Sequence, residues 1–559
     1  MQPWRILKKV DFVAVILVLL MLELNNQFVK NKLLFLVVLV SVIILSCARK
    51  GRPEGGPKDE DAPIMVTANP PYETINFDKK KIKIEFDEYI VLKDLSKQLV
   101  VSPPLKYPPV ITPQGTPSKS INIEILDTLR TNTTYTFNFG NAVQDNNENN
   151  KLESFKYVFS TGNYIDSLKI KGAVASSFKK EKLKNISVLL YRLDSTYNDS
   201  IVYKEKPNYV TSTLDSTNFE FTNLRDGKYL LLALKEASSD YLFNSKTDQV
   251  GFYTDTISLP KDTLITKPIR LFKELQPYKF KRGKEVVKGK IQFGYEGERE
   301  EMKIELLSAV PETFKSFSEF EKAKDTLSYW FTPVAQDSLN FIVSNKNFID
   351  TVTVSLRKNK IDSLSVSSTV GINLHLNDTL LLNTNNPIVS LDKSKFSLVD
   401  KDTVNVDFEV KKQSVNKLAV LFKKAPKMNY KFNVLPKGII DLYETTNDTL
   451  NYQFKTLTVE DYGSIILEVK KETGYPVIIQ LLNNKKIVKT RYISSSQKVE
   501  FNLLEPKEYT VRAIVDENNN RVWDTGNFLS RKQPEQVIYF ETVFKLRANW
   551  IQNEEFVIK

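Results

Sequence analysis

The sequence of 559 residues predicts an all-β fold, with antiparallel β-sandwich domains in series behind an N-terminal signal and lipid anchor. Three observations predict this fold. Apolar and polar residues alternate with a period of two over many short stretches, which is typical of half-buried strands. Asn, Asp, Gly and Pro separate these stretches, as expected for turns. Two blocks of sequence recur later in the chain in the same order, which indicates duplicated domains.

The chain begins with two apolar runs, residues 12–22 and residues 33–46. The second run has 14 residues, whereas a helix that crosses a bilayer needs about 20 apolar residues. Two lysines precede it, so it has the form of a secretion signal. We therefore predict that residues 1–46 are a signal peptide. A start at Met21 would give an ordinary signal by itself, and the alternative is a membrane helix at 12–22.

The only cysteine of the chain stands at the end of the second run. Ile44-Leu45-Ser46-Cys47 resembles the lipobox of bacterial lipoproteins, in which the cysteine becomes the lipidated first residue. Cys47 has no partner for an intrachain disulfide, and we predict that it carries lipid and attaches the chain to a membrane. The alternative is a membrane anchor with an incidental cysteine. Residues 47–63 are rich in Gly, Pro and charge, and we expect them to be the lipidated Cys and a flexible tether.

Strand patterning begins after the tether. In residues 80–92 (KKIKIEFDEYIVL) the apolar Ile82, Ile84 and Phe86 alternate with charged residues, which predicts a half-buried strand. Similar stretches follow almost to the end of the chain. The one helix-like stretch after the signal, at residues 312–324, is brief.

Two sets of repeats define the predicted domains. Tyr135-Thr-Phe-Asn recurs as Tyr430-Lys-Phe-Asn, 295 residues later, and YVFST (157–161) recurs at the same offset as YQFKT (452–456). Residues 218–244 align without gaps on 498–524. We expect two copies of a two-domain unit with an unmatched β-rich segment between them. The predicted domains are residues 64–163, 164–275, 276–367, 368–457 and 458–559.

Residues 64–163 resemble the SbsA-type bacterial Ig-like domain of surface-layer and exported proteins. The matching stretches are ANPPYETINFDKKKIKIEFDEYI, the VSPP from Val101, Leu129 to Tyr135, Asp145, and Phe159-Ser-Thr-Gly162. Residues 368–457 resemble a divergent second copy. The blocks with FTNLRDGKYLLLAL and FNLLEPKEYTVRAI are similar to transthyretin-like or carboxypeptidase-regulatory sandwiches. The whole chain resembles Bacteroidetes-type Ig-like lipoproteins, which implies an outer-membrane location in the cell envelope and supplies no catalytic residues.

The content of catalytic residues favours a protein that is not an enzyme. The chain has one histidine, His375, and one cysteine, which excludes zinc sites of the usual His/Cys spacing. No Gly-x-Ser-x-Gly or phosphate-binding glycine motif is present. We expect His375 to be a strand histidine paired to a neighbour. The net charge of +12 is spread along the chain, so it predicts no nucleic-acid partner. A basic surface that attracts anionic lipid or polysaccharide is the alternative to a well-solvated one.

One stretch has the spacing of a calcium loop. In DENNNRVWD, oxygen-bearing groups stand at positions 1, 3, 5, 7 and 9 of the loop. They are Asp516, Asn518, Asn520, Val522 (through its carbonyl) and Asp524. Arg521 replaces the glycine at position 6 and Asn527 replaces the bidentate Glu at position 12. The same positions of the earlier copy hold a degraded set, Glu236, Ser238, Asp240 and Asn244. The alternative is an ordinary hairpin turn, and calcium is the one cofactor that the sequence indicates.

These observations predict a non-enzymatic, lipid-anchored cell-envelope protein that acts as a structural or binding scaffold. Its expected partners are the membrane, through the lipid, and envelope polysaccharide or other envelope proteins. The alternative is a carbohydrate-binding accessory lipoprotein of a surface glycan-uptake system. Tyr329, Trp330 and Trp523 are the aromatic candidates for sugar stacking, and a place in the core is the competing interpretation of them. An enzyme within residues 276–367 is a third reading, which the lack of His, Cys and glycine motifs disfavours.

Overall fold

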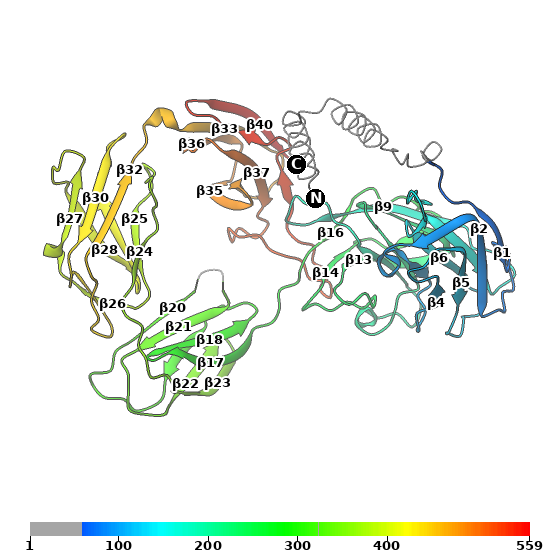
Figure 1. The fold of residues 1–559 in the computed structure, drawn as a ribbon, viewed down its shortest axis with the longest axis horizontal. Coiled ribbons are helices and arrows are strands. Elements are labelled where there is room, and N and C mark those ends of the chain that lie inside the picture. The colour runs from blue at the N-terminus through cyan, green and yellow to red at the C-terminus, as the bar shows by residue number, and fades with distance from the viewer. Residues whose placement is uncertain (1–58, 322–323) are drawn as a thin grey trace, which may run out of the picture. The chain divides into compact units, whose positions relative to one another are not determined.

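The computed structural model describes residues 59–321 and 324–559 (Figure 1). Strands make up most of the regular structure in these residues, and the one α-helix, α3 (Leu95–Gln98), lasts a single turn. The all-β prediction is confirmed. The predicted signal, Cys47 and most of the tether lie outside the described residues. Of the described residues, 59–62 and 147–150 belong to one compact unit and the rest to another; within the first, the Asn150 side-chain amide donates to the Asp59 carbonyl (2.9 Å).

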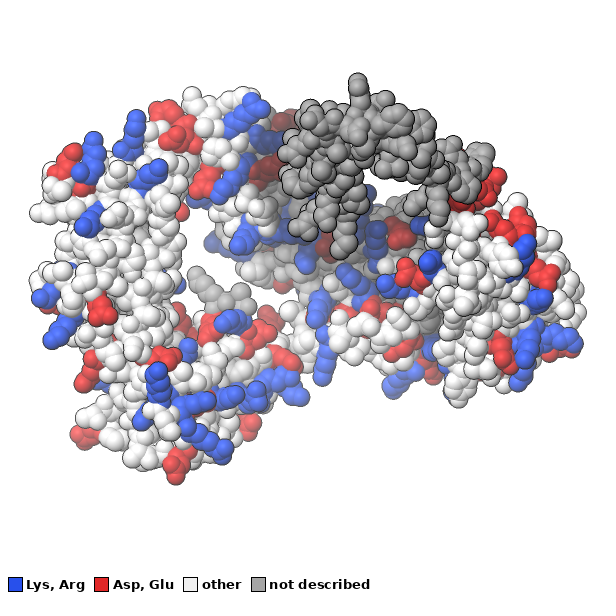
Figure 2. All heavy atoms as spheres, in the orientation of Figure 1, with Lys and Arg blue, Asp and Glu red and all other residues white. Residues whose placement is uncertain are grey.

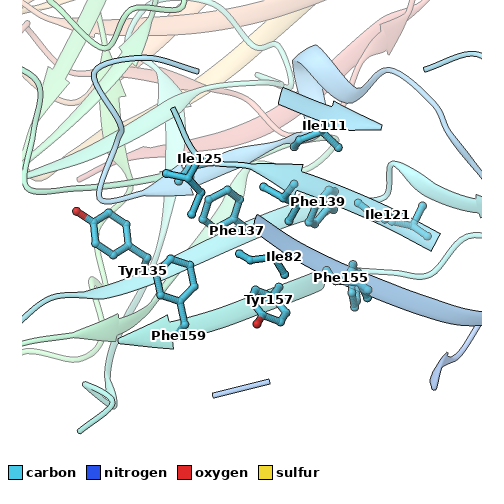
Figure 3. Close-up of a cluster of buried hydrophobic side chains, with 14 of the residues drawn as sticks. Ile82, Ile111, Ile121, Ile125, Tyr135, Phe137, Phe139, Phe155, Tyr157 and Phe159 are labelled. Atoms are coloured by element: carbon cyan, nitrogen blue, oxygen red, sulfur yellow. The ribbon is translucent and has the colours of Figure 1, made fainter. Parts of the chain in front are cut away.

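The first sandwich has two facing sheets. One consists of β1 (Met65–Asn69), β2 (Lys81–Leu92), β5 (Ser118–Glu124) and β4 (Val110–Thr112), with β7 (Val143–Asp145) on β2; the other consists of β3 (Val100–Ser102), β6 (Thr134–Gly140) and β8 (Phe155–Ser160). Between them lies an aromatic core (Figure 3), in which Phe137, Phe139 and Phe159 are completely buried. The core forms because Ile82 and Ile84 point inward while Lys83 and Glu85 point to solvent, as the alternation predicts.

The second sandwich is built in a different order. Its larger sheet consists of β11 (Tyr209–Ser212), β10 (Ser187–Arg192), β13 (Gly227–Lys235) and β14 (Gln249–Phe252), with β15 (Ile257–Leu259) on β13; its smaller sheet consists of β12 (Asn218–Leu224), β9 (Leu168–Ser176) and β16 (Ile269–Leu271). The β9–β16 pair is parallel and the other pairs are antiparallel. A 3₁₀ turn, η1 (Asp199–Tyr203), lies between β10 and β11.

The third sandwich corresponds to the unmatched segment. Its sheets are β17 (Lys279–Val287), β18 (Lys290–Glu296), β21 (Thr326–Phe331) and β20 (Ser316–Phe320), and β19 (Lys303–Leu306), β22 (Ser338–Asn345) and β23 (Phe348–Ser355). The expected helix at 312–324 is wrong, because Ser316–Phe320 pairs with β21 as strand β20. Phe314, Phe317 and Phe320 recur every three residues and so imitate a helical stripe, and the pairing with β21 overrides that local pattern.

The fourth sandwich has two main sheets and a short strand pair. The sheets are β24 (Val366–Ser368), β25 (Leu380–Thr384), β29 (Lys417–Phe422) and β28 (Phe408–Ser414), and β27 (Phe396–Asp400), β30 (Asn429–Val434) and β32 (Leu450–Lys455); the pair is β26 (Ile388–Leu391) with β31 (Ile439–Asp441). A 3₁₀ turn, η2 (Lys393–Lys395), precedes β27. Strand β24 begins two residues before the expected domain start at residue 368, since Val366 pairs with Thr384.

The fifth sandwich repeats the strand order of the second. Its sheets are β35 (Lys486–Ile493), β34 (Val477–Asn483), β37 (Glu508–Val515) and β38 (Val537–Tyr539), with β39 (Phe544–Lys545) on β37, and β36 (Gln497–Leu504), β33 (Gly463–Lys471) and β40 (Ile551–Ile558); η3 (Val459–Asp461) precedes β33. The β33–β40 pair is parallel, like β9–β16. The gapless alignment of residues 218–244 on 498–524 therefore corresponds to equivalent strands.

The first and fourth sandwiches share a hydrogen-bonded corner at the predicted offset of 295 residues. The Tyr135 hydroxyl accepts the Arg130 N–H (2.9 Å), and the Tyr430 hydroxyl accepts the Ala425 N–H (2.8 Å). A threonine hydroxyl completes each corner by donating to the carbonyl of the same upstream residue, Arg130 or Ala425. Three pairs of equivalent positions thus make equivalent bonds, which short stretches of shared alternation would not produce by chance.

We predict that Tyr135→Phe and Tyr430→Phe each lower the unfolding free energy of their own sandwich by about 0.5–1.5 kcal/mol, because each leaves one backbone N–H without its acceptor. Hydrogen exchange, monitored at increasing denaturant concentration for the amides of each sandwich, measures the two changes in unfolding free energy separately. Tyr89→Phe is the control, since the Tyr89 side chain is 57% exposed. Equal stability of Tyr135→Phe and Tyr89→Phe would contradict a stabilising corner.

Candidate functional site

The predicted calcium loop lies at the start of the connection between β37 and β38. Asp516 is buried, and its two carboxylate oxygens accept the N–H groups of Asn520 (3.0 Å) and Arg521 (2.9 Å). Arg521 occupies the position where a calcium loop has glycine, and it adopts φ 66°. This left-handed conformation is unfavourable for a residue with a Cβ atom by roughly 1–2 kcal/mol. The loop therefore makes the required sharp turn without glycine.

Hydrogen bonds connect all five predicted ligand residues within one turn. Asp524 Oδ2 accepts hydrogen bonds from the side-chain amides of Asn518 and, at 3.0 Å, Asn520. The Asn520 Oδ1 atom accepts the Val522 N–H (2.9 Å). Val522 thus takes part through its N–H, whereas the prediction used its carbonyl. The amide nitrogens of Asn518 and Asn520 point at Asp524, so both amides would have to rotate before their oxygens could face a shared cation.

Glu535 is a member of this site that the sequence analysis missed. It is 3% exposed, and its two carboxylate oxygens accept the N–H groups of Glu517 (2.9 Å) and Asp524 (3.0 Å). Burial raises the pKa of Glu535, and the nearby charges of Asp524 and Asp516 raise it further. Glu535 lies outside the nine-residue stretch 516–524, so the spacing within that stretch could not indicate it. The contact forms because the chain returns toward the loop just before β38.

The negative charges of Asp516, Asp524 and Glu535 would favour a cation nearby. Each of these carboxylates, however, already accepts hydrogen bonds from N–H groups of the loop. In the described part of the chain, no group of three or more His, Cys, Asp or Glu side chains has the arrangement of a metal site. The residues as they stand fit a turn closed by its own backbone N–H groups. Calcium binding at this loop remains a prediction, and it requires the rotated amides described above.

In the earlier copy, the corresponding side chains stabilise local turns. Glu236 Oε2 accepts the Tyr241 N–H (2.8 Å), Asp240 accepts the Leu242 N–H (2.9 Å), and Asn244 accepts the Lys246 N–H (3.1 Å). Among the described residues, no hydrogen bond joins two of the four predicted ligand positions of this copy. The degraded spacing therefore corresponds to separate backbone turns.

His375 lies in a turn before β25, so its expected strand position is wrong. Its Nε2 atom donates to the carbonyl of Leu503 (2.6 Å), its Nδ1 atom accepts the Asn377 N–H (3.0 Å), and its ring packs edge-on against Tyr462. The expectation of a histidine paired to neighbours holds. Both ring nitrogens are engaged, so neither is available to act as a general base in this conformation.

The aromatic candidates for sugar stacking lie mostly in cores. Tyr329 and Trp330 on β21 are 5% and 3% exposed. Trp523 is half-buried, packs against Phe178 with ring centroids 4.5 Å apart, and donates its indole N–H to the Glu535 carbonyl (3.0 Å). The core interpretation is therefore correct for Tyr329 and Trp330, and Trp523 serves a packing contact.

Two open clefts lie where strands of the first two sandwiches meet. One, of about 640 Å³, is mainly apolar and is lined by leucines and prolines such as Leu99 and Pro109. The other, which we call the polar cleft, has a volume of about 770 Å³ and is lined by amides, hydroxyls and charged groups together with apolar side chains such as Phe219 and Leu264. In the polar cleft, burial lowers the pKa of Lys156, and Lys171 pairs with Glu220 (3.4 Å). Both volumes lie in the range of small-molecule sites.

The exposed surface carries both signs of charge. Figure 2 shows Lys and Arg interspersed with Asp and Glu on the visible face. Ion pairs such as Lys281 with Glu296 (2.6 Å) and Lys470 with Glu555 (2.7 Å) mix the charges at close range. Among the helices that the structure describes, none has the length and apolar character to cross a membrane.

Comparison with known protein families gives a match for one part of the chain. Residues 59–161 match the model of the bacterial Ig-like domain, which agrees with the resemblance stated above for residues 64–163. No curated protein matches the chain at a significant level.

Solved structures with some likeness are proteins built from serial domains. Domains 5–6 of the S-layer protein SbsC align at 11% identity over 33% of this chain and 99% of that one, with a TM-score of 0.17. Domains 1–6 of the same protein align at 12% identity over 94% and 71%, with a TM-score of 0.15. Titin domains A168–A170 align at 10% identity over 43% and 93%, with a TM-score of 0.14. Likeness at this level supports no inference about what this chain does.

We predict that the loop binds Ca²⁺ with a Kd of about 10⁻⁴ to 10⁻³ M, as weak extracellular sites do. Tb³⁺ is the probe, because Trp523 lies within the loop and can sensitise its luminescence. The full chain should show Tb³⁺ emission. Millimolar Ca²⁺ should displace the Tb³⁺ and abolish this emission, and millimolar Mg²⁺ should not.

Asp524→Asn is the matched control, since it keeps the size of the side chain and removes one negative charge. It should weaken Ca²⁺ displacement of Tb³⁺ at least fivefold. Identical titrations for the parent and Asp524→Asn, or no displacement by 10 mM Ca²⁺, would show that the loop is only a turn.

Proposed function

We propose that this chain is a non-enzymatic, lipid-anchored protein of the cell envelope and that its sandwiches act as a structural or binding scaffold. The observation that supports this most is the order of its parts. A lipobox-like Ile44-Leu45-Ser46-Cys47 and a short polar tether come directly before a bacterial Ig-like domain at residues 59–161. An envelope location follows most simply from that order, and the outer membrane is the membrane we propose.

The tether sets how far the scaffold can stand from the bilayer. Since Asp59 is hydrogen-bonded to Asn150, the extensible part is residues 48–58, which can extend by at most about 3.6 Å each and so span no more than about 40 Å. Since a single acyl chain gives only marginal membrane binding, we propose that Cys47 carries more than one. The sandwiches then present their clefts and loops at a distance from the lipid.

A carbohydrate-binding accessory role is the second candidate. The polar cleft of about 770 Å³ favours it, because amides, hydroxyls and charged groups suit a ligand rich in hydroxyls. An envelope polysaccharide is the ligand class we propose for that cleft. The burial of Tyr329 and Trp330 removes the stacking surface first considered for this role.

Cys47→Ser tests the anchor. We predict that the parent chain partitions with the membrane fraction and that at least nine-tenths of Cys47→Ser appears in the soluble fraction or as uncut precursor. Ser46→Ala is the control, since it keeps both a small residue and the cysteine, and it should fractionate like the parent. Unchanged processing and fractionation of Cys47→Ser would refute the lipid anchor.

A further inference from the structure

The connection between β37 and β38 extends from the fifth sandwich into the second. Phe528, at the tip of this connection, has no exposed surface. Its ring packs edge-on against Phe252 at 5.7 Å and against Phe243 at 6.5 Å. It belongs to the same buried cluster as Leu189 and Leu232 of the second sandwich. A residue of the last sandwich therefore completes a core that lies 250 residues and more earlier in the chain.

Polar contacts fix the segment around Phe528 on both sides. The Phe528 N–H donates to Glu274 (2.6 Å), which is 8% exposed, and the Thr525 hydroxyl donates to the Lys273 carbonyl (2.7 Å). A hydrogen bond from an N–H group to a charged carboxylate is among the stronger types. Burial raises the pKa of Glu274, and the bond from Phe528 opposes that rise.

The far end of the segment makes a second set of contacts. Arg531 pairs with Asp199 and donates to the Tyr197 hydroxyl (3.1 Å), and the Gln533 amide donates to the Phe252 carbonyl (2.9 Å). The Arg531 guanidinium also lies over the Phe528 ring at 4.5 Å. These contacts specify an aromatic residue followed three positions later by arginine.

The second sandwich has an unusual surface where this segment lies. One face of its larger sheet covers the internal core, as in any sandwich. The opposite face would ordinarily be polar and solvated, yet it carries Leu230, Leu232 and Leu234, which are at most 6% exposed. The equivalent positions of the fifth sandwich, 280 residues later, are Thr510, Arg512 and Ile514.

The difference between the two copies shows whether leucines on the outer face are required for folding. If the fold required leucine on this outer face, the fifth sandwich would have apolar residues at positions 510 and 512 as well. Because it has threonine and arginine there, the fold is compatible with a polar outer face. The leucines of the second sandwich therefore serve the apolar layer that covers them, in which Val202 and Phe243 of the same sandwich lie beside Phe528.

We propose that the outer face of the β11–β10–β13–β14 sheet is a peptide-binding site and that its occupant is the chain's own segment 525–533. The ligand class is an extended peptide with a buried aromatic side chain, a free backbone N–H for Glu274 and an arginine for Asp199. Docking fastens the second and fifth sandwiches to each other. This proposal is independent of the lipid anchor and of the scaffold function.

The test uses the full chain and a fluorescent peptide with the sequence of residues 523–535. Phe528→Asp should release the segment and open the site, so that this variant binds the added peptide at least tenfold more tightly than the parent does. Leu529→Asp is the matched control, because Leu529 is 55% exposed next to Phe528, and it should behave like the parent. A peptide in which alanine replaces the phenylalanine should bind neither variant.

Hydrogen exchange of the Phe528 amide provides a second measurement that does not depend on how well Phe528→Asp folds. Arg531→Ala removes the pairing with Asp199 from a side chain that is 36% exposed, and it should accelerate exchange of that amide at least threefold. The proposal is overturned if folded Phe528→Asp fails to bind the peptide. It is equally overturned if the Phe528 amide exchanges as fast in the parent as in Arg531→Ala.

Discussion

The structure depends on burial of alternate side chains between paired sheets. Along β2, Ile82 and Ile84 enter the core while Lys83 and Glu85 face solvent, and a shift of the strand by one residue would reverse all of them. Short strands cannot bury enough apolar surface singly, so each sheet requires a second sheet against it. The corner bonds of Tyr135 and Tyr430 then fix how the chain enters the strand in each copy.

Once that constraint is met, the outer faces and connections of each sandwich are free to differ. The second and fifth sandwiches share strand order and a parallel edge pair, yet Leu232 of one corresponds to Arg512 of the other. Their β-strand connections also differ, since Phe243 remains within its own sandwich and Phe528 docks in another. Fold and function are separate in this way in many duplicated domains, and here the differences are located at the loops and outer faces.

Local patterns predicted the fold class and the repeats, because alternation and turn residues act over a few positions. The same locality explains the errors. Phenylalanines at 314, 317 and 320 imitated a helical stripe in a segment that pairs as a strand, and His375 occupies a turn instead of a strand. In the candidate site, the spacing predicted a calcium loop with Asp516 and Asp524 as ligands; both lie in one turn, and calcium binding there stays a prediction. Glu535 and the docking of Phe528 depend on contacts between distant residues, for which a single sequence gives no signal.

The central claim is that one two-sandwich unit occurs twice and obeys the same physical constraints in both copies. Hydrogen exchange across the described chain tests it most directly, because protection reports the strength of each strand pairing. We predict that the central strands β6 and β30, and likewise β13 and β37, are the slowest to exchange within their own sandwiches. Rapid exchange of β30 or β37 beside a protected β6 or β13 would contradict the claim.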